Sequence, residues 1–523
     1  MEMLRKKFEQ NKKWLCYSMV AAFIWGLAAH SYGFMDNSFS HDSLNELHGA
    51  IFGSDLKIVM GRIFVPVYRD LIRSDATLPW LIGLLSLLWI GLAVFLTIRI
   101  FHIESKILIF LTAGIFVTNI SVSATAATYL HELDGYMFSL LCAIAAVYLW
   151  HRFSWGFLPG AVGIAVSLGM YQGYLPVAIV LILISCVLDL LNEKSFRDVF
   201  LRGLKAIGML LLGGALYFVS IKGMLWLTHL SLATGRYNSM DVMKGLTPRL
   251  FLEMTIGAYK DCFARLWNVP STYPAPLIQG ATLLLTAVSV IAVITGLLNK
   301  KVGVPEKLLC LVLIALLPLG MNLLYVLTIA DIHDLMVYAI WLFYFLALLL
   351  GNWLARRWKE SSSSCARMKI GQLLNGGCLL AVLFLMYGNV QFANGMYLKK
   401  DLEYDAYLSL MTRVVYRMED YDGYVPGETP VYFACLPEDL NKSIPGFKEY
   451  QTVTGMEQTD LLCIPLRNRF QAYFDYILCA PVNLVQDERW YEMSTDPRIP
   501  EMPCYPADDC IAMIDNILVV KLG

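Results

Sequence analysis

The chain has 523 residues, of which 57% are hydrophobic and 16% are charged, and its mean hydropathy is +0.57. Soluble domains carry about 25% charged residues, so this composition excludes a single soluble domain, a disordered chain and a nucleic-acid-binding protein with a basic surface. The formal net charge is −1. This total carries little information, whereas the distribution of charge along the chain carries more.

Apolar segments long enough to cross a bilayer recur over the first three quarters of the chain. Each span needs about 20 mostly apolar residues. We predict eleven transmembrane helices, at residues 14–34, 79–100, 106–123, 135–151, 156–171, 173–191, 206–228, 277–298, 307–329, 335–355 and 370–391. The first is too long for a cleaved signal peptide and further spans follow it. The sequence therefore predicts a polytopic α-helical membrane protein.

Lys and Arg are concentrated at the N-terminus and in every second loop after it. The short loops 124–134, 172 and 330–334 contain neither residue. Because basic loops stay in the cytoplasm, we predict a cytoplasmic N-terminus and, with eleven spans, an external C-terminus. The outer face then consists of a first outer loop (35–78), a large outer loop (229–276) and a tail (392–523).

The first outer loop places two acids and a histidine directly after the first span: Asp36, His41 and Asp42. An amphipathic helix in the plane of the membrane surface is predicted from the spacing of Leu44, Leu47, His48 and Ile51. Asp42 then has two interpretations. It stabilises the start of this helix through the helix dipole, or it is a carboxylate that accepts a proton at the membrane surface. Asp36 is the second candidate for that proton acceptor.

Later in the same loop, Gly61 and Arg62 interrupt an apolar stretch. The forked donors of an arginine at a membrane surface suit a phosphate. The alternative is an arginine that extends to lipid headgroups. Arg69 and Arg73 are predicted to be interfacial anchors.

The loop at 124–134 ends in His131, Glu132 and Asp134, with no basic residue nearby in sequence, and Tyr136 follows. Solvated loop charge is one interpretation. The other is a functional site, because the loop is short and adjoins the bilayer.

Further polar groups fall on the same predicted face. Tyr171 and Gln172 lie between two spans, where interfacial tyrosines are an alternative explanation. His333 precedes Asp334, which is predicted to cap the next helix. In the large outer loop, the spacing of Glu253, Lys260 and Asp261 predicts a solvated helix face.

The tail differs in composition from the rest of the chain, with 11 Lys and Arg against 21 Asp and Glu. Short runs at 430–434 and 517–521 predict strands, and Pro and Gly punctuation predicts a small α/β domain. A polar helix at about 396–420 is expected to connect it to the last span. Five cysteines cannot all pair internally, and Cys504 with Cys510 is a candidate disulfide.

Several motifs are absent from the sequence. There is no Walker loop, GxGxxG, HExxH or GxSxG pattern, and no zinc-ligand spacing. We therefore expect no cofactor, no metal site, no nucleic-acid partner and a substrate that is external or carried by a lipid.

The order of these features resembles that of polytopic glycosyltransferases of the GT-C fold. The closest resemblance is to the bacterial type II glucosyltransferase family, the serotype-converting O-antigen glucosyltransferases. It covers nearly the whole chain and rests on Ser40-His41-Asp42-Ser43-Leu44, Gly61-Arg62, the stretches 129–136, 170–174, 332–339 and 391–397, and the tail segments 502–506 and 519–522.

This resemblance implies a polyprenyl-phosphate-linked hexose donor, usually undecaprenyl-phosphate glucose, used on the outer face of the bacterial cytoplasmic membrane. The acceptor would be a glycan such as O-antigen or a cell-wall polymer. A first-loop Asp is the catalytic base in GT-C enzymes, which corresponds to Asp42. Family members often carry paired acids at this point, whereas this chain has His41-Asp42. Both Asp42 and Asp36 are therefore kept as candidates.

The expected organisation is a GT-C-like transmembrane domain (1–391) and an extracytoplasmic domain (392–523). Arg62 would hold the donor phosphate. The acceptor-side or supporting residues would be His41, Glu132, Asp134, Tyr136, Tyr171, Gln172 and His333. Besides the donor, the acceptor and the lipid bilayer, candidate partners are a flippase and a donor synthase.

A transporter or lipid-linked glycan flippase without chemistry is the alternative. Transporters place ionisable residues at mid-membrane depth and consist of related halves. Here the polar clusters fall on one predicted face, and no related halves are visible. A glycan polymerase or ligase would differ only in its donor.

Overall fold

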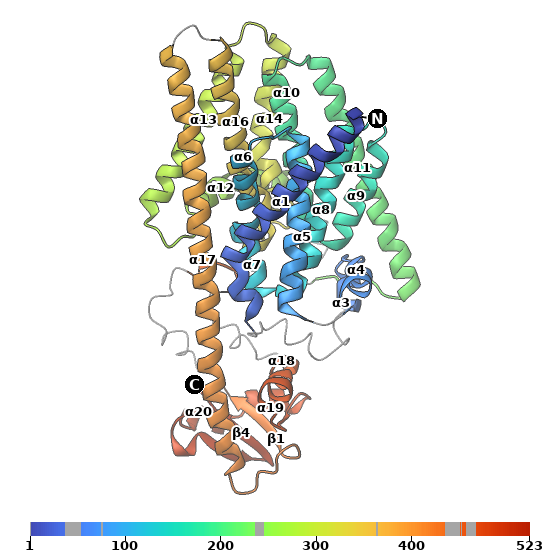
Figure 1. The fold of residues 1–523 in the computed structure, drawn as a ribbon. Helices are drawn as coiled ribbons and strands as arrows, with labels where there is room; N and C mark the ends of the chain where they lie inside the picture. The colour runs from blue at the N-terminus through green and yellow to red at the C-terminus, as the bar shows by residue number, and fades with distance from the viewer. Residues whose placement is uncertain are drawn as a thin grey trace.

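The computed structural model describes residues 2–36, 54–74, 77–235, 245–361, 365–434, 450, 452–454, 456 and 467–523. Most of these residues form a bundle of long helices, and a smaller mixed α/β unit lies beyond one end of it (Figure 1). The prediction of a polytopic helical membrane protein is confirmed at this level.

Nine helices of the described chain are long and apolar enough to cross a membrane, or ten if the bent pair α6 and α7 forms one span. The bundle consists of α1 (Glu2–Met35), α5 (Pro79–Ile100), α6 (Lys106–Thr118), α7 (Ile120–Thr128), α8 (Leu130–Arg152), α9 (Phe157–Met170), α10 (Leu175–Leu191), α11 (Phe196–Thr228), α13 (Ala275–Leu297), α14 (Val304–Met321), α16 (Leu342–Ser361) and α17 (Cys365–Glu419). Nine of the eleven predicted segments coincide with the nine candidate helices, and the segment 106–123 falls on the bent pair α6 and α7. The segment 156–171 falls on α9, which has only 14 residues, fewer than the about 20 needed for a full span.

The 20-residue helix α12 and several short elements connect these helices and carry many of the polar groups discussed below. They are α3 (Ser54–Val59), α4 (Val65–Ile72), η1 (Gln172–Tyr174), α12 (Pro248–Trp267), α15 (Leu323–Leu327), η3 (Asp334–Met336) and η4 (Tyr338–Trp341). Figure 1 shows α3 and α4 at the end of the bundle that faces the α/β unit.

The bend between α6 and α7 is set by one side chain. Asn119 has an extended backbone conformation, and its side chain accepts a hydrogen bond from Val122 N at 3.2 Å, which caps α7. The same side chain donates to Ile115 O at 2.9 Å in α6. Asn119 therefore satisfies backbone groups of both helices at the 40° bend, where an unpaired group would be costly.

Helix α17 has 55 residues and is therefore about 80 Å long. It runs without a break from the bundle into the tail, as Figure 1 shows. The predicted connecting helix at about 396–420 is thus the second half of α17.

The tail contains a four-stranded sheet with the order β2-β1-β4-β3. The strands are β1 (Pro430–Ala434), β2 (Asn483–Leu484), β3 (Ile511–Ile514) and β4 (Ile517–Lys521), and the helical turns are α18 (Arg467–Ala472), η7 (Tyr473–Leu478), α19 (Arg489–Ser494), α20 (Arg498–Glu501) and η8 (Asp508–Cys510). Strand β1 is parallel to β2 and β4, whereas β3 is antiparallel to β4. The two runs predicted to be strands are β1 and β4.

Both faces of this sheet are covered. Leu518 and Val520 of β4 pack in one hydrophobic cluster with residues of α17, and Val519 packs in the other with Met493 of α19. All five residues of β4 are buried, as expected for a central strand between two layers. The candidate disulfide is wrong, because Cys504 and Cys510 are both free thiols.

Part of the tail sequence belongs to the bundle instead. Tyr450, Val453 and Met456 are buried in the large hydrophobic core of the bundle, whereas the sheet and α18 have separate cores. We call Tyr450, Thr452, Val453, Thr454 and Met456 the docking segment.

Candidate functional site

A tight turn between α3 and α4 carries Gly61 and Arg62. Gly61 has a φ of +78°, a left-handed conformation in which other residues are strained. The Tyr217 hydroxyl in α11 donates to the Gly61 carbonyl oxygen at 2.9 Å, and Gln172 Nε2 in η1 donates to the Tyr217 hydroxyl at 2.8 Å. Two other elements therefore fix the backbone that presents Arg62.

The Arg62 guanidinium lies against two stacked tyrosine rings. Its Nη1 donates to the Tyr136 hydroxyl at 2.7 Å, and its central carbon lies 5.6 Å from the centroid of the Tyr136 ring and 5.1 Å from that of the Tyr171 ring. The two ring centroids are 4.0 Å apart, and the ring planes differ by 12°. Cation–π contacts of this kind stabilise a cation by about 0.5–2 kcal/mol but leave its charge unneutralised.

Within the described residues, Arg62 forms no ion pair with a carboxylate, although Lys57, Arg69 and Arg73 nearby all do. Its Nε is buried and has no hydrogen-bond partner. A buried donor without a partner costs about 1–3 kcal/mol. An anion that accepts from this Nε would remove the cost, and phosphate has the matching geometry.

Glu132 and Asp134 lie near the start of α8 and have relative exposures of 1% and 0%. The Lys57 ammonium of α3 forms an ion pair with Glu132, and Arg69 Nη2 of α4 lies 2.8 Å from Glu132 Oε1. The interpretation of these acids as solvated loop charge is therefore wrong. Their place near a helix N-terminus also favours negative charge through the helix dipole.

Asp134 has a comparable set of partners. Arg73 Nε lies 2.9 Å from its Oδ2, and the Tyr68 hydroxyl donates to the same oxygen at 3.1 Å. Burial, together with the nearby Asp134, raises the pKa of Tyr68, so this hydroxyl keeps its proton and remains a donor. Arg69 and Arg73 are buried and ion-paired, so their prediction as interfacial anchors is wrong.

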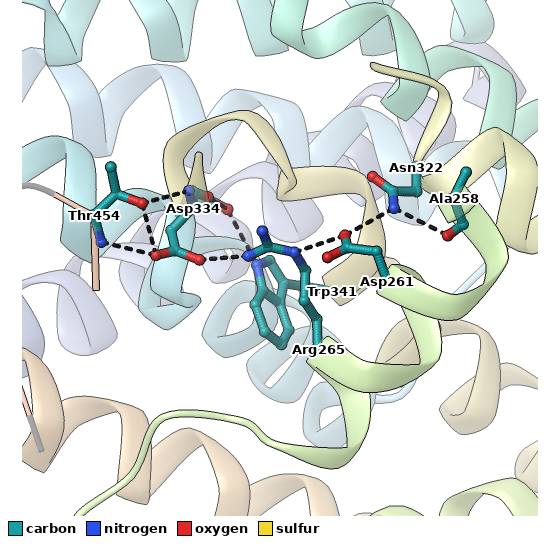
Figure 2. A network of polar contacts seen from close by, with 8 residues as sticks. Ala258, Asp261, Arg265, Asn322, Asp334, Trp341 and Thr454 are labelled. Atoms are coloured by element: carbon teal, nitrogen blue, oxygen red, sulfur yellow. Dashed lines mark hydrogen bonds and ion pairs between the residues drawn. The ribbon is translucent and has the colours of Figure 1, made fainter. Parts of the chain in front are cut away.

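A second polar network is centred on Asp334 (Figure 2). Arg265 of α12 donates from Nη1 to Asp334 Oδ1 at 2.5 Å and from Nε to Asp261 Oδ2 at 2.8 Å. The docking segment approaches Asp334 from the other side, where Thr454 N and Oγ1 donate to Oδ2 at 2.9 and 3.0 Å. Asn322 donates to Asp261 Oδ2 at 2.9 Å and completes the network.

These contacts correct two predictions. Asp334 does not cap a helix, because no side-chain cap bond is formed at η3 and its carboxylate holds Arg265 and Thr454 instead. Asp261 does not lie on a solvated face, because it faces Arg265 and Asn322. His333 precedes η3 and is half-buried.

Of the two candidate bases, Asp36 lies within the described residues. Asp36 directly follows α1, is half-buried, and lies within electrostatic reach of Tyr404 on α17. Asp42 and His41 lie outside the described residues. The predicted amphipathic helix after Asp42 also lies outside them.

The fold thus brings some of the predicted residues together and separates others. Arg62, Tyr136, Tyr171 and Gln172 form one cluster, which we call the arginine–tyrosine cluster. Glu132 lies beside it, bound to the cations of α3 and α4. His333 adjoins the separate Asp334 network. Sequence reasoning overlooked Lys57 and interpreted Arg265 as an ordinary surface residue of the large outer loop, which is wrong because Arg265 pairs with Asp261 and Asp334. The only signal for either cation was the presence of acids without a partner nearby in sequence in an apolar setting.

The profile of the family described as Glucosyl transferase GtrII matches residues 32–332, more than half of the chain. The chain belongs to this glucosyl transferase family. The predicted resemblance is thereby confirmed, and with the apolar helices it identifies a membrane glycosyltransferase. The matched region contains the arginine–tyrosine cluster and ends before Asp334 and the tail. No curated protein matches the chain.

Proposed function

We propose that this membrane glycosyltransferase moves a hexose, in the first instance glucose, from a polyprenyl-phosphate carrier to a cell-surface glycan. The observation that supports the proposal is Arg62, a cation on stacked tyrosines with an unpartnered buried Nε and no carboxylate partner in the described chain. The phosphodiester of such a donor carries one negative charge and suitable acceptor oxygens.

The proposed reaction is a direct displacement at C1 of the hexose. A first-loop carboxylate, Asp42 or alternatively Asp36, takes the proton of the acceptor hydroxyl as this oxygen attacks C1. The bond between C1 and the phosphate oxygen breaks, and polyprenyl phosphate leaves with that electron pair. The configuration at C1 is inverted, and the proton stays on the carboxylate. Arg62 stabilises the charge that develops on the leaving phosphate.

The remaining residues of the site have supporting roles in this proposal. Glu132 and Asp134 hold the cations of α3 and α4 and so position the turn that carries Arg62. Tyr136, Tyr171 and Gln172 fix the guanidinium and its turn. His41 and His333 are proposed to contact the acceptor.

We further propose that the N-terminus is cytoplasmic and that the reaction occurs on the outer face of the bacterial cytoplasmic membrane. The basic N-terminus and the basic alternate loops support this orientation. If the bent pair α6 and α7 and the short α9 each count as one span beside the nine candidate helices, the total is eleven, and the α/β tail is extracytoplasmic. The turn with Arg62 and the tail lie toward the same end of the bundle (Figure 1), in agreement with this arrangement.

The test uses purified full-length protein, undecaprenyl-phosphate [14C]glucose, and the envelope glycan extracted from a strain that lacks the gene. Wild type is expected to form labelled glycan. Asp42→Asn is expected to lower the rate by about 10²–10⁴-fold at an unchanged protein level, and Asp36→Asn is run in parallel. Asp70→Asn, an exposed acid of α4, is the matched control.

The outcomes separate the alternatives. Full activity of Asp42→Asn together with loss of activity in Asp36→Asn would move the base to Asp36. Full activity of both variants would remove the first-loop carboxylates from the mechanism. Movement of labelled lipid across reconstituted vesicles without any labelled glycan would instead support a transporter or flippase.

A further inference from the structure

The tail is joined to the bundle at a second place besides α17, through the docking segment. Its described residues bury themselves in the bundle, with relative exposures of 0% for Val453 and 2% for Met456. The sheet and α18, which flank the segment in sequence, pack in other clusters. The chain therefore leaves the tail after β1, contacts the bundle and returns to the tail at α18.

Three separate anchors hold this segment. The Tyr450 ring lies 4.9 Å from the Phe392 ring of α17, and it fills the space beside Gly395, where an added Cβ would come within 2.0 Å of the Tyr450 hydroxyl. The Met456 carbonyl accepts from Lys399 Nζ at 3.3 Å. A larger residue at position 395 would therefore exclude Tyr450.

The central anchor is Thr454 on Asp334, and it is reciprocal. Thr454 donates to Asp334 Oδ2 from its N–H and its hydroxyl, and Thr454 Oγ1 accepts from Asp334 N at 3.2 Å. The Asp334 carbonyl accepts from Ser121 Oγ of α7 at 2.5 Å. Both carboxylate oxygens of Asp334 are engaged, because Oδ1 accepts from Arg265. The Asp334 carboxylate therefore binds Arg265 with one oxygen and the docking segment with the other.

A partly buried ion pair is a weak source of stability, and its best-supported use is to fix one register between packed elements. Here the pair joins α12, η3 and the docking segment, which come from three distant parts of the chain (Figure 2). It therefore defines how the tail is aligned with the end of the bundle.

We propose that the Thr454–Asp334–Arg265 contact is a latch that sets the position of the tail relative to the bundle, and that this position determines how well the glycan acceptor binds. The proposal rests on the proposed function, in which Arg62 binds the phosphate of the lipid-borne donor and His333, the residue directly before Asp334, contacts the glycan acceptor. Thr454 and Asp334 are then positioning residues for the acceptor and have no part in donor binding.

Thr454→Val tests the latch because it keeps the shape of the side chain and removes the hydroxyl. Thr454→Ser keeps the hydroxyl and should restore the wild-type behaviour. Thr412→Val is the matched control, since Thr412 is exposed on α17 and its hydroxyl bonds only within that helix, to Leu408 O.

Two readouts are measured on the purified full chain. In hydrogen exchange, amides of the docking segment should be protected in wild type and in Thr412→Val, and should exchange about fivefold faster in Thr454→Val. In transfer assays with the extracted envelope glycan, Thr454→Val should raise KM for the glycan about fivefold and leave KM for undecaprenyl-phosphate glucose unchanged.

Unchanged exchange in Thr454→Val would overturn the latch itself. Faster exchange with an unchanged glycan KM, or with an equal rise in both KM values, would overturn its role in acceptor binding. If wild type transfers no glucose at all, the proposed function fails, while the exchange experiment still decides whether the latch exists.

Discussion

Arg62 and Arg265 are both partly buried arginines outside the candidate spans, and their surroundings differ. Arg265 lies between two carboxylates, Asp261 and Asp334. Arg62 lies on two tyrosine rings, and within the described residues it has no carboxylate partner. A cation that two carboxylates already neutralise has no charge left for a ligand, whereas a cation without a carboxylate partner can bind an anion. This difference supports Arg62, and not Arg265, as the proposed site for the donor phosphate.

The largest effect on the free energy of unfolding is expected at Glu132, which pairs with two buried cations. Glu132→Gln would leave the buried Lys57 and Arg69 without their shared carboxylate. We expect a loss of about 3–5 kcal/mol in the free energy of unfolding, measured by denaturant titration in detergent.

Glu253→Gln is the control for this experiment, because Glu253 forms only an exposed pair with Arg249, worth at most about 1 kcal/mol. If Glu132→Gln unfolds like wild type, the acids of α8 do not hold α3 and α4 in place.

Substitution of Arg62 should instead affect the transfer rate much more than the free energy of unfolding. Arg62→Ala is expected to lower the transfer rate by about 10²–10³-fold, as the loss of one stabilising donor does in other transferases and hydrolases, while the free energy of unfolding changes little. Arg62→Lys keeps the charge but not the forked pair of donors, so its transfer rate should lie between those of wild type and Arg62→Ala.

Arg249→Ala, at an exposed position on α12, is the matched arginine control for these two variants. A variant Arg62→Ala that keeps full activity would refute the assignment of the phosphate to Arg62.

Arg265→Met should affect stability more than chemistry. It leaves Asp261 and Asp334 without their shared cation, and we expect a loss of about 2 kcal/mol. This loss is smaller than for Glu132→Gln because the Arg265 and Asp334 side chains remain 21% and 12% exposed. The folded fraction should retain donor KM. A raised donor KM at unchanged stability would show that Arg265 contacts the donor and that Arg62 and Arg265 do not differ in this way.

The smallest effect is expected at the tyrosines. Tyr136→Phe removes the hydroxyl that accepts from Arg62 and keeps the ring, and we expect about a tenfold rise in donor KM. Tyr171→Phe keeps the ring on which the guanidinium lies, so its donor KM should stay close to wild type. Equal effects in both variants would mean that ring chemistry, and not the Arg62 hydrogen bond, controls the site.

Local patterns in the sequence predicted the elements but not the pairs between them. The runs at 430–434 and 517–521 are β1 and β4, because alternation and composition are properties of each segment alone. The sequence predicts Glu132 in a loop and does not show its partners, because Lys57 and Arg69 lie more than sixty residues away. Nothing in the large outer loop indicated that Arg265 would meet Asp334, or that Thr454 of the tail would reach it.

The sequence by itself determined that the chain is a helical membrane protein, that it resembles the type II glucosyltransferases, and that Arg62 follows a glycine in an apolar stretch. Hydropathy and short motifs depend only on neighbouring residues, so they can be recognised from the sequence alone. Only the tertiary structure determines which charged side chains have a partner of opposite charge. These ion pairs form between segments that are distant in sequence and that helix packing brings together. In this protein the difference in carboxylate partners distinguishes Arg62, the proposed site of the donor phosphate, from Arg265, which Asp261 and Asp334 already bind.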